Sequence, residues 1–155
     1  MKRHKTYQGS ISKSSDLRPN QIYVFGSNTE GRHGKGSALI ALQEFGAKYG
    51  QASGMQGRSY AIITKDLRKK VHPSVSPEII KKQIQHLYKI ATDSEYEYVI
   101  SYRANVINLN NYSPKEMAAM YAAFDIPLNF VFEEKFYELI CEEILLKKLK
   151  DGIED

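Results

Sequence analysis

The sequence predicts an α/β fold, a three-layer α/β/α sandwich with a mostly parallel central sheet. Two observations predict it. Short runs of β-branched and aromatic residues alternate with longer segments whose apolar residues recur every three or four positions. Polar loops follow the first three of these runs, and a helical segment comes after each loop. Such alternation is typical of right-handed crossovers that build a parallel sheet with helices on both faces.

The first strand and the first helix flank a glycine-rich loop. Residues 1–20 are polar and predict an N-terminal arm, which leaves residues 21–150 as a single domain. Residues 21–25 have the composition of a strand, and the glycine-rich loop occupies residues 26–36. Residues 37–49 carry apolar side chains at helical spacing, and two glycines predict the end of that helix.

The middle of the chain predicts a second strand, a helix and a third strand. Residues 59–63 have strand composition. The helix that follows covers residues 76–92, because Ser76 is a good N-cap residue and Pro77 fits the first helical position. Residues 96–102 predict the third strand.

The last part of the chain predicts two further helices around a fourth strand. The first helix covers residues 113–124, and Ser113 and Glu116 give it a capping-box start. Residues 129–132 predict the strand, and residues 133–149 a closing amphipathic helix.

Three polar loops follow strands, at residues 26–36, 64–68 and 103–113. In a parallel sheet the loops after the strands meet at one edge, which is where ligands bind in such folds. The three loops are therefore expected to form one crevice.

The composition is that of an ordinary globular domain, with 42% hydrophobic and 26% charged residues. No apolar run reaches the roughly 18–20 residues that span a bilayer, and the basic N-terminus is followed by polar residues. A cytoplasmic protein without a membrane partner is therefore expected. The single cysteine, Cys141, rules out an internal disulfide, and His72 and His86 have no metal-spaced companion, so no metal or cofactor is predicted. The net charge of +4 is compatible with anionic ligands or nucleic acid.

The glycine-rich loop is the strongest functional signal. Eight of the ten glycines lie between Gly26 and Gly57. A strand that enters such a loop and a helix that leaves it bring backbone amides and the positive helix end against a phosphate. Two common phosphate motifs do not fit. A Walker loop would need a glycine at Thr29 and a hydroxyl residue at Gly36, and a dinucleotide fingerprint would need its third glycine at Leu39.

Four stretches resemble a macrodomain-like family that is common in phage and prophage genomes. They read Val24-Phe25-Gly26-Ser27-Asn28, Gly31-Arg32-His33-Gly34-Lys35-Gly36-Ser37-Ala38, Phe45-Gly46-Ala47-Lys48-Tyr49-Gly50-Gln51 and Gly54-Met55-Gln56-Gly57-Arg58-Ser59-Tyr60-Ala61-Ile62-Ile63-Thr64-Lys65-Asp66. With a weaker likeness further on, the resemblance covers residues 20–135. Macrodomains are three-layer α/β/α modules that bind ADP-ribose and related nucleotides, and some hydrolyse ADP-ribose from proteins or small molecules. The resemblance therefore implies an ADP-ribose-type ligand, and an ADP-ribosyl hydrolase if there is turnover.

The resemblance also implies ligand contacts by position. Asn28 matches the strand-end asparagine that contacts the distal ribose, although it could instead cap the turn there. Gly34 and Gly36 match the glycine loop over the pyrophosphate. Lys35 could pair with a phosphate or be a solvated lysine. The expected ligand-binding residues come from three loops: Gly26, Ser27, Asn28, Gly31, Arg32, Gly34, Lys35, Gly36, Ser37, Thr64, Arg103 and Asn105.

The segment after the third strand departs from the family. Typical members carry several glycines there, whereas residues 101–112 contain none. A loop that should approach a ribose or phosphate has acquired side chains, so this half of the site is expected to be remodelled or partly lost. Its four asparagines suit turns as readily as ligands.

Four residues are candidates for catalysis: Glu30, His33, Lys65 and Asp66. Glu30 is the only carboxylate inside the loop and could activate a water that attacks an anomeric carbon. His33 suits proton transfer or a structural role in the loop. One macrodomain subgroup uses a lysine and an aspartate to remove ADP-ribose esters. Lys65 and Asp66 are adjacent at a strand exit, however, and adjacent residues point to opposite faces unless the strand bends.

Two other classes of function stay open on the sequence. The chain could be a non-catalytic binder of nucleotides or nucleic-acid ends, with affinity for oligonucleotides that falls steeply with salt. It could also be an interaction scaffold whose partner surface is the altered segment at residues 103–112, and it would then bind no nucleotide.

Overall fold

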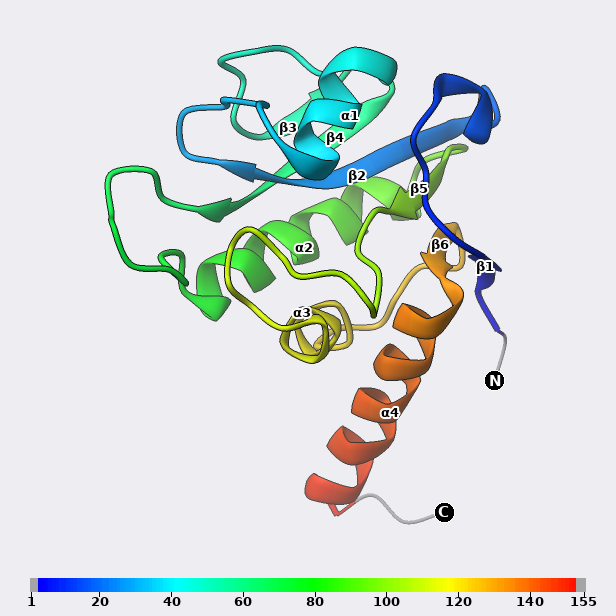
Figure 1. Cartoon of the computed structure of the whole chain (residues 1–155). Coiled ribbons are helices and arrows are strands. Elements are labelled where there is room, and N and C mark those ends of the chain that lie inside the picture. The colour runs from blue at the N-terminus through cyan, green and yellow to red at the C-terminus, as the bar shows by residue number, and fades with distance from the viewer. Residues whose placement is uncertain (1–2, 153–155) are drawn as a thin grey trace.

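The computed structural model describes residues 3–152, which form a six-stranded sheet with α-helices on both faces (Figure 1). The strands are β1 (Lys5–Tyr7), β2 (Gln21–Asn28), β3 (Gly54–Gln56), β4 (Ser59–Lys65), β5 (Glu97–Ile100) and β6 (Phe130–Glu133). The α-helices are α1 (Gly36–Glu44), α2 (Pro77–Thr92), α3 (Pro114–Tyr121) and α4 (Glu134–Lys150). The strand order is β1-β6-β5-β2-β4-β3, and all neighbours are parallel except β3 and β4. The predicted α/β sandwich with a mostly parallel sheet is confirmed.

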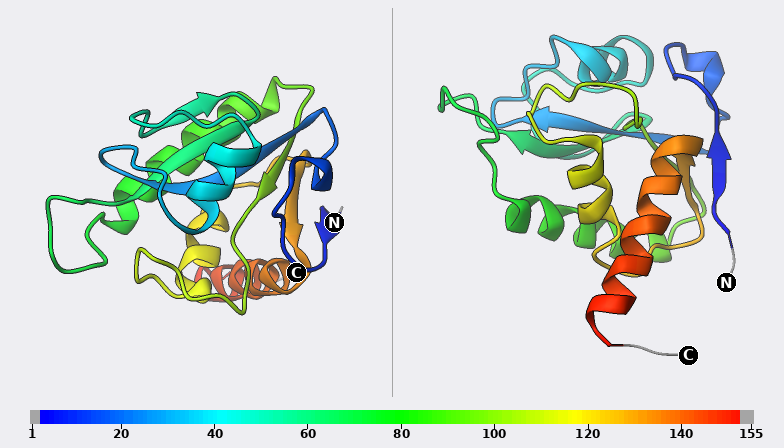
Figure 2. Two further views of the ribbon diagram at one scale, coloured as in Figure 1. Left: turned by 45° about the horizontal axis from the view of Figure 1, so that its top comes forward. Right: turned by 60° about the horizontal axis from the view of Figure 1, so that its bottom comes forward.

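Two cores lie on the two faces of the sheet, because successive strand residues point to opposite sides. On β2, Ile22 and Val24 belong to the core that α2, α3 and α4 cover. Tyr23 and Phe25 belong to the core beneath α1. The two views of Figure 2 show α1 and the other three helices on opposite sides of the sheet. Within residues 3–152, α1 is the one α-helix on its side of the sheet, and the N-terminal segment covers part of the core there.

The N-terminal segment is more than the arm predicted for residues 1–20. Its residues Lys5–Tyr7 form the edge strand β1, which pairs in parallel with residues 131–133 of β6 (Figure 2). A short 3-10 helix follows at Ser14–Asp16, and Ile11 and Leu17 are buried in the α1-side core. The polar composition hides this role, because an edge strand of three mostly exposed residues carries little hydrophobic signal.

A contact between two glycines ends α1 earlier than the predicted residue 49. Gly46 and Gly57 both have positive φ angles, and a Cβ on Gly57 would lie 2.6 Å from the Gly46 carbonyl oxygen. This close approach joins the segment after α1 to the turn between β3 and β4. The antiparallel β3–β4 pair was not predicted, because its three-residue first strand is too short to show a period.

The helix starts agree with the sequence. The Ser76 hydroxyl accepts a hydrogen bond from Ile79 N at the start of α2, and Ser113 and Glu116 form the complete capping box of α3. Glu133, which was assigned to the last helix, is instead the final residue of β6 and the N-cap of α4. None of the helices in residues 3–152 is both long and apolar enough to cross a membrane.

Candidate functional site

A crevice of about 250 Å³ opens at the carboxyl ends of β2, β4 and β5. All three predicted loops contribute to it, as does the N-terminal segment. Six of the expected ligand-binding residues line it: Gly26, Lys35, Gly36, Ser37, Thr64 and Arg103. The remaining lining residues are Ser10, Ile11, Ser12, Tyr23, Ile40, Ser101, Tyr102, Val106, Ile107, Asn108, Leu109 and Asn110. The crevice thus combines a polar floor with apolar side chains along its walls.

The floor of the crevice is a group of hydroxyls above Gly26. A Cβ built on Gly26 would lie 2.5 Å from Tyr102 Oη and 3.2 Å from Thr64 Oγ1, so the absent side chain makes room for both. Asn110 Nδ2 donates to Tyr102 Oη at 3.3 Å. Burial raises the pKa of Tyr102 to about 12. The phenol is therefore protonated at neutral pH and gives the floor a neutral hydroxyl instead of a negative charge.

The N-terminus of α1 forms one wall. Lys35 is the N-cap residue, and its side chain makes no capping hydrogen bond. Backbone N–H groups in the first turn of a helix lack partners inside the helix, and with the helix dipole they favour an anion. Lys35 and Arg103 also place two cationic side chains on the crevice. The helix end and these two cations, of which Arg103 lies on the opposite wall, make the crevice attractive to an anion.

The opposite wall, residues 101–113, is shaped by its asparagines. Asn108 Nδ2 donates to Tyr112 O at 2.9 Å, and Asn110 Oδ1 accepts from Tyr112 N at 2.9 Å. Asn111 has a φ of +64°, and its Nδ2 donates to His72 O at 3.2 Å. These three asparagines build turns, which is one of the two roles that the sequence allowed. Side-chain hydrogen bonds thus hold a segment in which glycines were expected.

The two walls meet above α1. A Cβ on Gly36 would lie 3.4 Å from Leu109 Cδ1, so the leucine covers the first turn of the helix. Asn105, an expected ligand contact, lies outside the crevice in a shallow hollow with Asn111 and Glu116. The segment therefore lines this part of the crevice with the apolar side chain of Leu109. The Asn105 amide, which was predicted to contact the ligand, lies outside the crevice.

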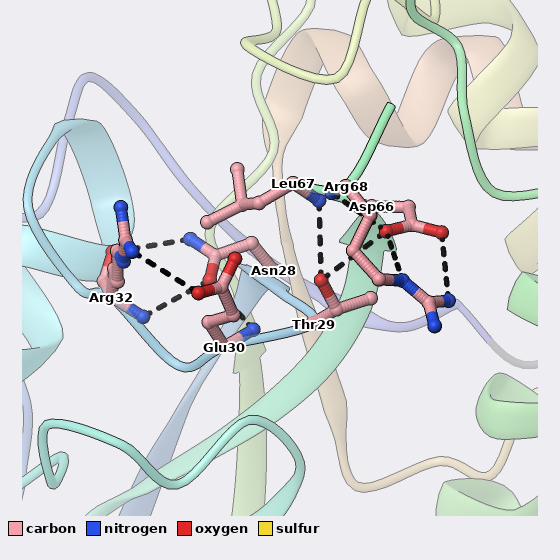
Figure 3. A network of polar contacts seen from close by, with 7 residues as sticks. All are labelled: Asn28, Thr29, Glu30, Arg32, Asp66, Leu67 and Arg68. Carbon is pink, nitrogen blue, oxygen red and sulfur yellow. Dashed lines mark hydrogen bonds and ion pairs between the residues drawn. The ribbon is translucent and has the colours of Figure 1, made fainter. Parts of the chain in front are cut away.

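Asn28 organises the glycine loop and does not line the crevice (Figure 3). Its Oδ1 accepts from Glu30 N at 3.2 Å and Arg32 N at 3.0 Å, and its Nδ2 donates to Arg32 O at 3.1 Å. Glu30 forms an ion pair with Arg32 Nη2 at 3.1 Å, and both side chains are exposed. Asn28 therefore makes the turn-capping contacts, and Glu30 lies on the outer side of the loop.

Asp66 is held by Arg68 (Figure 3). Arg68 Nε donates to Asp66 Oδ1 and Arg68 Nη2 to Asp66 Oδ2, both at 3.0 Å. These hydrogen bonds, with one from Arg68 N, lower the pKa of Asp66 to about 2. A carboxylate with so low a pKa is a weak base at neutral pH. Asp66 lines a separate hollow with Lys82 and His86 of α2, and neither it nor Lys65 lines the crevice.

His33 anchors the glycine loop to the body of the protein. The side chain is fully buried and packs edge-on against Phe25, with ring centroids 5.2 Å apart. Its Nε2 lies 3.1 Å from both Gln51 O and Gln56 Oε1. Because both neighbours are acceptors, Nε2 carries the proton. This arrangement gives His33 a structural role, and it does not line the crevice.

The other expected contacts lie on the outer part of the loop or beneath it. Gly31, Arg32 and Gly34 do not line the crevice, and a Cβ on Gly31 would meet the backbone of Gly50 at 2.7 Å. Ser27 is buried and its Oγ donates to Asn28 O at 3.4 Å. Of the twelve expected ligand-binding residues, six therefore line the crevice, five belong to the glycine loop and its entry strand without lining the crevice, and Asn105 lies elsewhere.

Sequence reasoning missed several lining residues. Ser101 and Tyr102 follow the last residue of β5 and had been assigned to the strand itself. Their place directly before Arg103 was the available signal. Ser10 and Ile11 could not be found from the sequence, because their position depends on the pairing of β1 with β6.

Among residues 3–152, no group of three or more His, Cys, Asp or Glu side chains could hold a metal ion. The chain matches no family model and no curated protein in the comparisons with known proteins. The function therefore has to be inferred from the crevice and its chemistry.

Proposed function

We propose that the crevice binds an ADP-ribose-type nucleotide, with a phosphate group at the N-terminus of α1. The observation that carries the proposal is the juxtaposition of this helix end with Lys35 and Arg103 at the carboxyl edge of the sheet. Backbone amides and a helix dipole bind phosphate without a sequence-specific side chain. An arginine adds planar donors and a lysine a mobile point charge.

The rest of the crevice suits a sugar attached to that phosphate. Ser37, Thr64 and the protonated Tyr102 offer hydroxyls, while Ile40 and Leu109 offer apolar surface. Ligand pockets combine such apolar walls with a few placed polar groups. The volume of about 250 Å³ is below the roughly 300–1,000 Å³ of typical ligand pockets. We therefore expect a sugar phosphate inside the crevice and the remainder of a nucleotide over its open mouth.

We propose ligand binding only and assign no catalytic residue. Glu30, Lys65 and Asp66 lie away from the crevice, and His33 is buried beneath the loop. Asp66 is in addition neutralised by Arg68. A base for water attack at an anomeric carbon would have to be supplied by movement of the loop or by the ligand.

Isothermal titration calorimetry with ADP-ribose, ADP, AMP and a short oligonucleotide tests the proposal. The expected result is saturable, weakly salt-dependent binding of ADP-ribose. Lys35→Ala and Arg103→Ala should each weaken it about tenfold, the effect of losing one charge-assisted hydrogen bond. Lys69→Ala, a charge change on the loop after β4 and away from the crevice, is the control.

Two results would overturn the proposal. Binding of the oligonucleotide alone, with an affinity that falls steeply with salt, would identify a nucleic-acid binder. Affinities weaker than about millimolar for every nucleotide would favour an interaction scaffold.

A further inference from the structure

The outer half of α4 carries an apolar stripe that stays largely exposed within residues 3–152. The first half of the helix buries Phe136, Tyr137 and Ile140, whereas every residue from 145 to 150 is exposed. In Figure 1 this end of α4 extends away from the sheet and the other helices. Leu145, Leu146 and Leu149 are 58%, 47% and 66% exposed, respectively.

The three leucines share one face of the helix. Leu145 and Leu149 are one turn apart, and Leu146 is adjacent to them on the helix surface. The opposite face points to the body, because Lys147 Nζ donates to Ala123 O at 3.0 Å, directly after α3. Glu142 precedes Leu145 by three residues and therefore continues the exposed stripe toward the N-terminus.

Charge is distributed unevenly along this face. Glu138 and Glu142 lie upstream of the leucines, and Lys148 and Lys150 lie beside or downstream of them. Within the described part of the chain, none of these four side chains forms an ion pair or a hydrogen bond with another residue. If a second copy of α4 packed parallel to the first, residues of like charge would lie side by side. An antiparallel copy of the same helix, with Leu145 opposite Leu149, would place Glu142 near Lys150 and would also oppose the two helix dipoles.

We infer that this stripe is a self-association surface whose occupant is a second copy of the chain. The two α4 helices pack antiparallel about a two-fold axis, so that Leu145 of each copy meets Leu149 of the other. Glu142 of each copy then lies near Lys150 of the other. A two-fold contact of this kind uses the same patch twice and closes on itself. It is independent of the crevice and leaves the crevice open.

The contact is small, since it uses about two turns of helix from each copy. Interfaces of this size are at the weak, transient end of the protein–protein range. Sedimentation equilibrium over protein concentrations from about 10 μM to 1 mM should therefore show reversible growth in mass from monomer toward dimer, which corresponds to a micromolar to millimolar dissociation constant.

Leu149→Glu should weaken this association at least tenfold, because it places a charge in the centre of the contact. Val71→Glu is the matched control, since Val71 is also an exposed apolar residue, 79% accessible, but lies in the loop before α2. Both side chains point to solvent, so neither change should alter the fold, which circular dichroism can verify. A mass that stays monomeric at every concentration, or an equal effect of the two variants, would overturn the inference.

A charge exchange tests the antiparallel orientation. Glu142→Lys and Lys150→Glu should each weaken association about threefold or more, and the double variant should restore it, since the ion pair is then re-formed with its signs reversed. Failure of the double variant to recover would contradict the antiparallel arrangement.

Discussion

The Tyr102 hydroxyl occupies the place where a side chain on Gly26 would begin. Gly26→Ala should therefore destabilise the protein by about 1–3 kcal/mol, because the new methyl group overpacks the floor of the crevice. Tyr102→Phe removes the oxygen 2.5 Å from that methyl position and should relieve part of the cost. Urea unfolding of the two single variants and the double variant gives the coupling between the sites.

A nearby glycine supplies the control for this measurement. A Cβ on Gly34 would come no nearer than 3.9 Å to any other atom, so Gly34→Ala should change the free energy of unfolding little. Additive effects of Gly26→Ala and Tyr102→Phe would mean that the hydroxyl is not what excludes the methyl group.

The ion pair between Asp66 and Arg68 should be visible in the titration of the protein. Hydrogen bonds from the Arg68 side chain are the main cause of the lowered Asp66 pKa, from 3.8 to about 2. The sign follows from linkage: because the folded-state pKa is below the unfolded one, the stabilisation is present above about pH 4 and is lost as the pH falls toward 2. In Arg68→Ala the Asp66 pKa should rise toward 3.8, as carboxyl-carbon NMR can measure.

The same spectra contain an internal reference. Hydrogen bonds from the backbone of Ser12 and Lys13, and not from Arg68, lower the pKa of Asp16 in the N-terminal 3-10 helix. Its titration should be unchanged in Arg68→Ala. An Asp66 midpoint that does not move in this variant would show that Arg68 does not set it.

At the scale of elements, α2 protects the edge of β4 beyond the short strand β3. Gln83 on α2 satisfies both backbone groups of Ile63: its Oε1 accepts from Ile63 N at 2.7 Å and its Nε2 donates to Ile63 O at 2.8 Å. One side-chain amide thus replaces the peptide group of a neighbouring strand. Gln83→Ala should cost about 1–3 kcal/mol, because both groups of Ile63 lose their partners.

Gln85→Ala is the matched control, since Gln85 is exposed on the same helix. Urea unfolding and the exchange rate of the Ile63 amide are the two measurements. Equal stability of the two variants, or an Ile63 amide that stays protected in Gln83→Ala, would contradict this role of the Gln83 side chain.

The elements that could be predicted are those with a strong period or a specific cap. The helix α2 combines an apolar stripe with Ser76 and Pro77, and its bounds agree with the prediction within one residue. The strands β1 and β3 have three residues each, too few to show alternation, and depend on partners distant in the sequence. The same limit applies within the site. The loop at residues 26–36 could be identified from its glycines, but which of its residues face the crevice depends on the contacts of Asn28 and His33.

At the scale of the whole molecule, β1 fastens the N-terminal segment to the edge of the sheet opposite β3. Beyond its pairing with β6, Lys5 Nζ lies 2.6 Å from Glu97 Oε2, and Tyr7 Oη donates to Ile100 O at 2.7 Å. His4 Nε2 lies 3.0 Å from Pro127 O and its Nδ1 3.0 Å from Tyr137 Oη. Residues 5–7, which the composition predicts to be part of an arm, therefore form a strand that contacts parts of the chain far away in the sequence.

Deletion of residues 1–8 should lower the free energy of unfolding by roughly 3–5 kcal/mol, the sum of several net hydrogen bonds. It leaves Ser10 and Ile11, which line the crevice, in the chain. Hydrogen exchange should therefore accelerate first at those β6 amides that point toward β1, because they lie at the new sheet edge, while the central strands β2 and β4 keep most of their protection. Uniform acceleration across the sheet would instead mean that β1 stabilises only the global fold. Unchanged exchange at β6 would mean that β1 is not part of the cooperative structure.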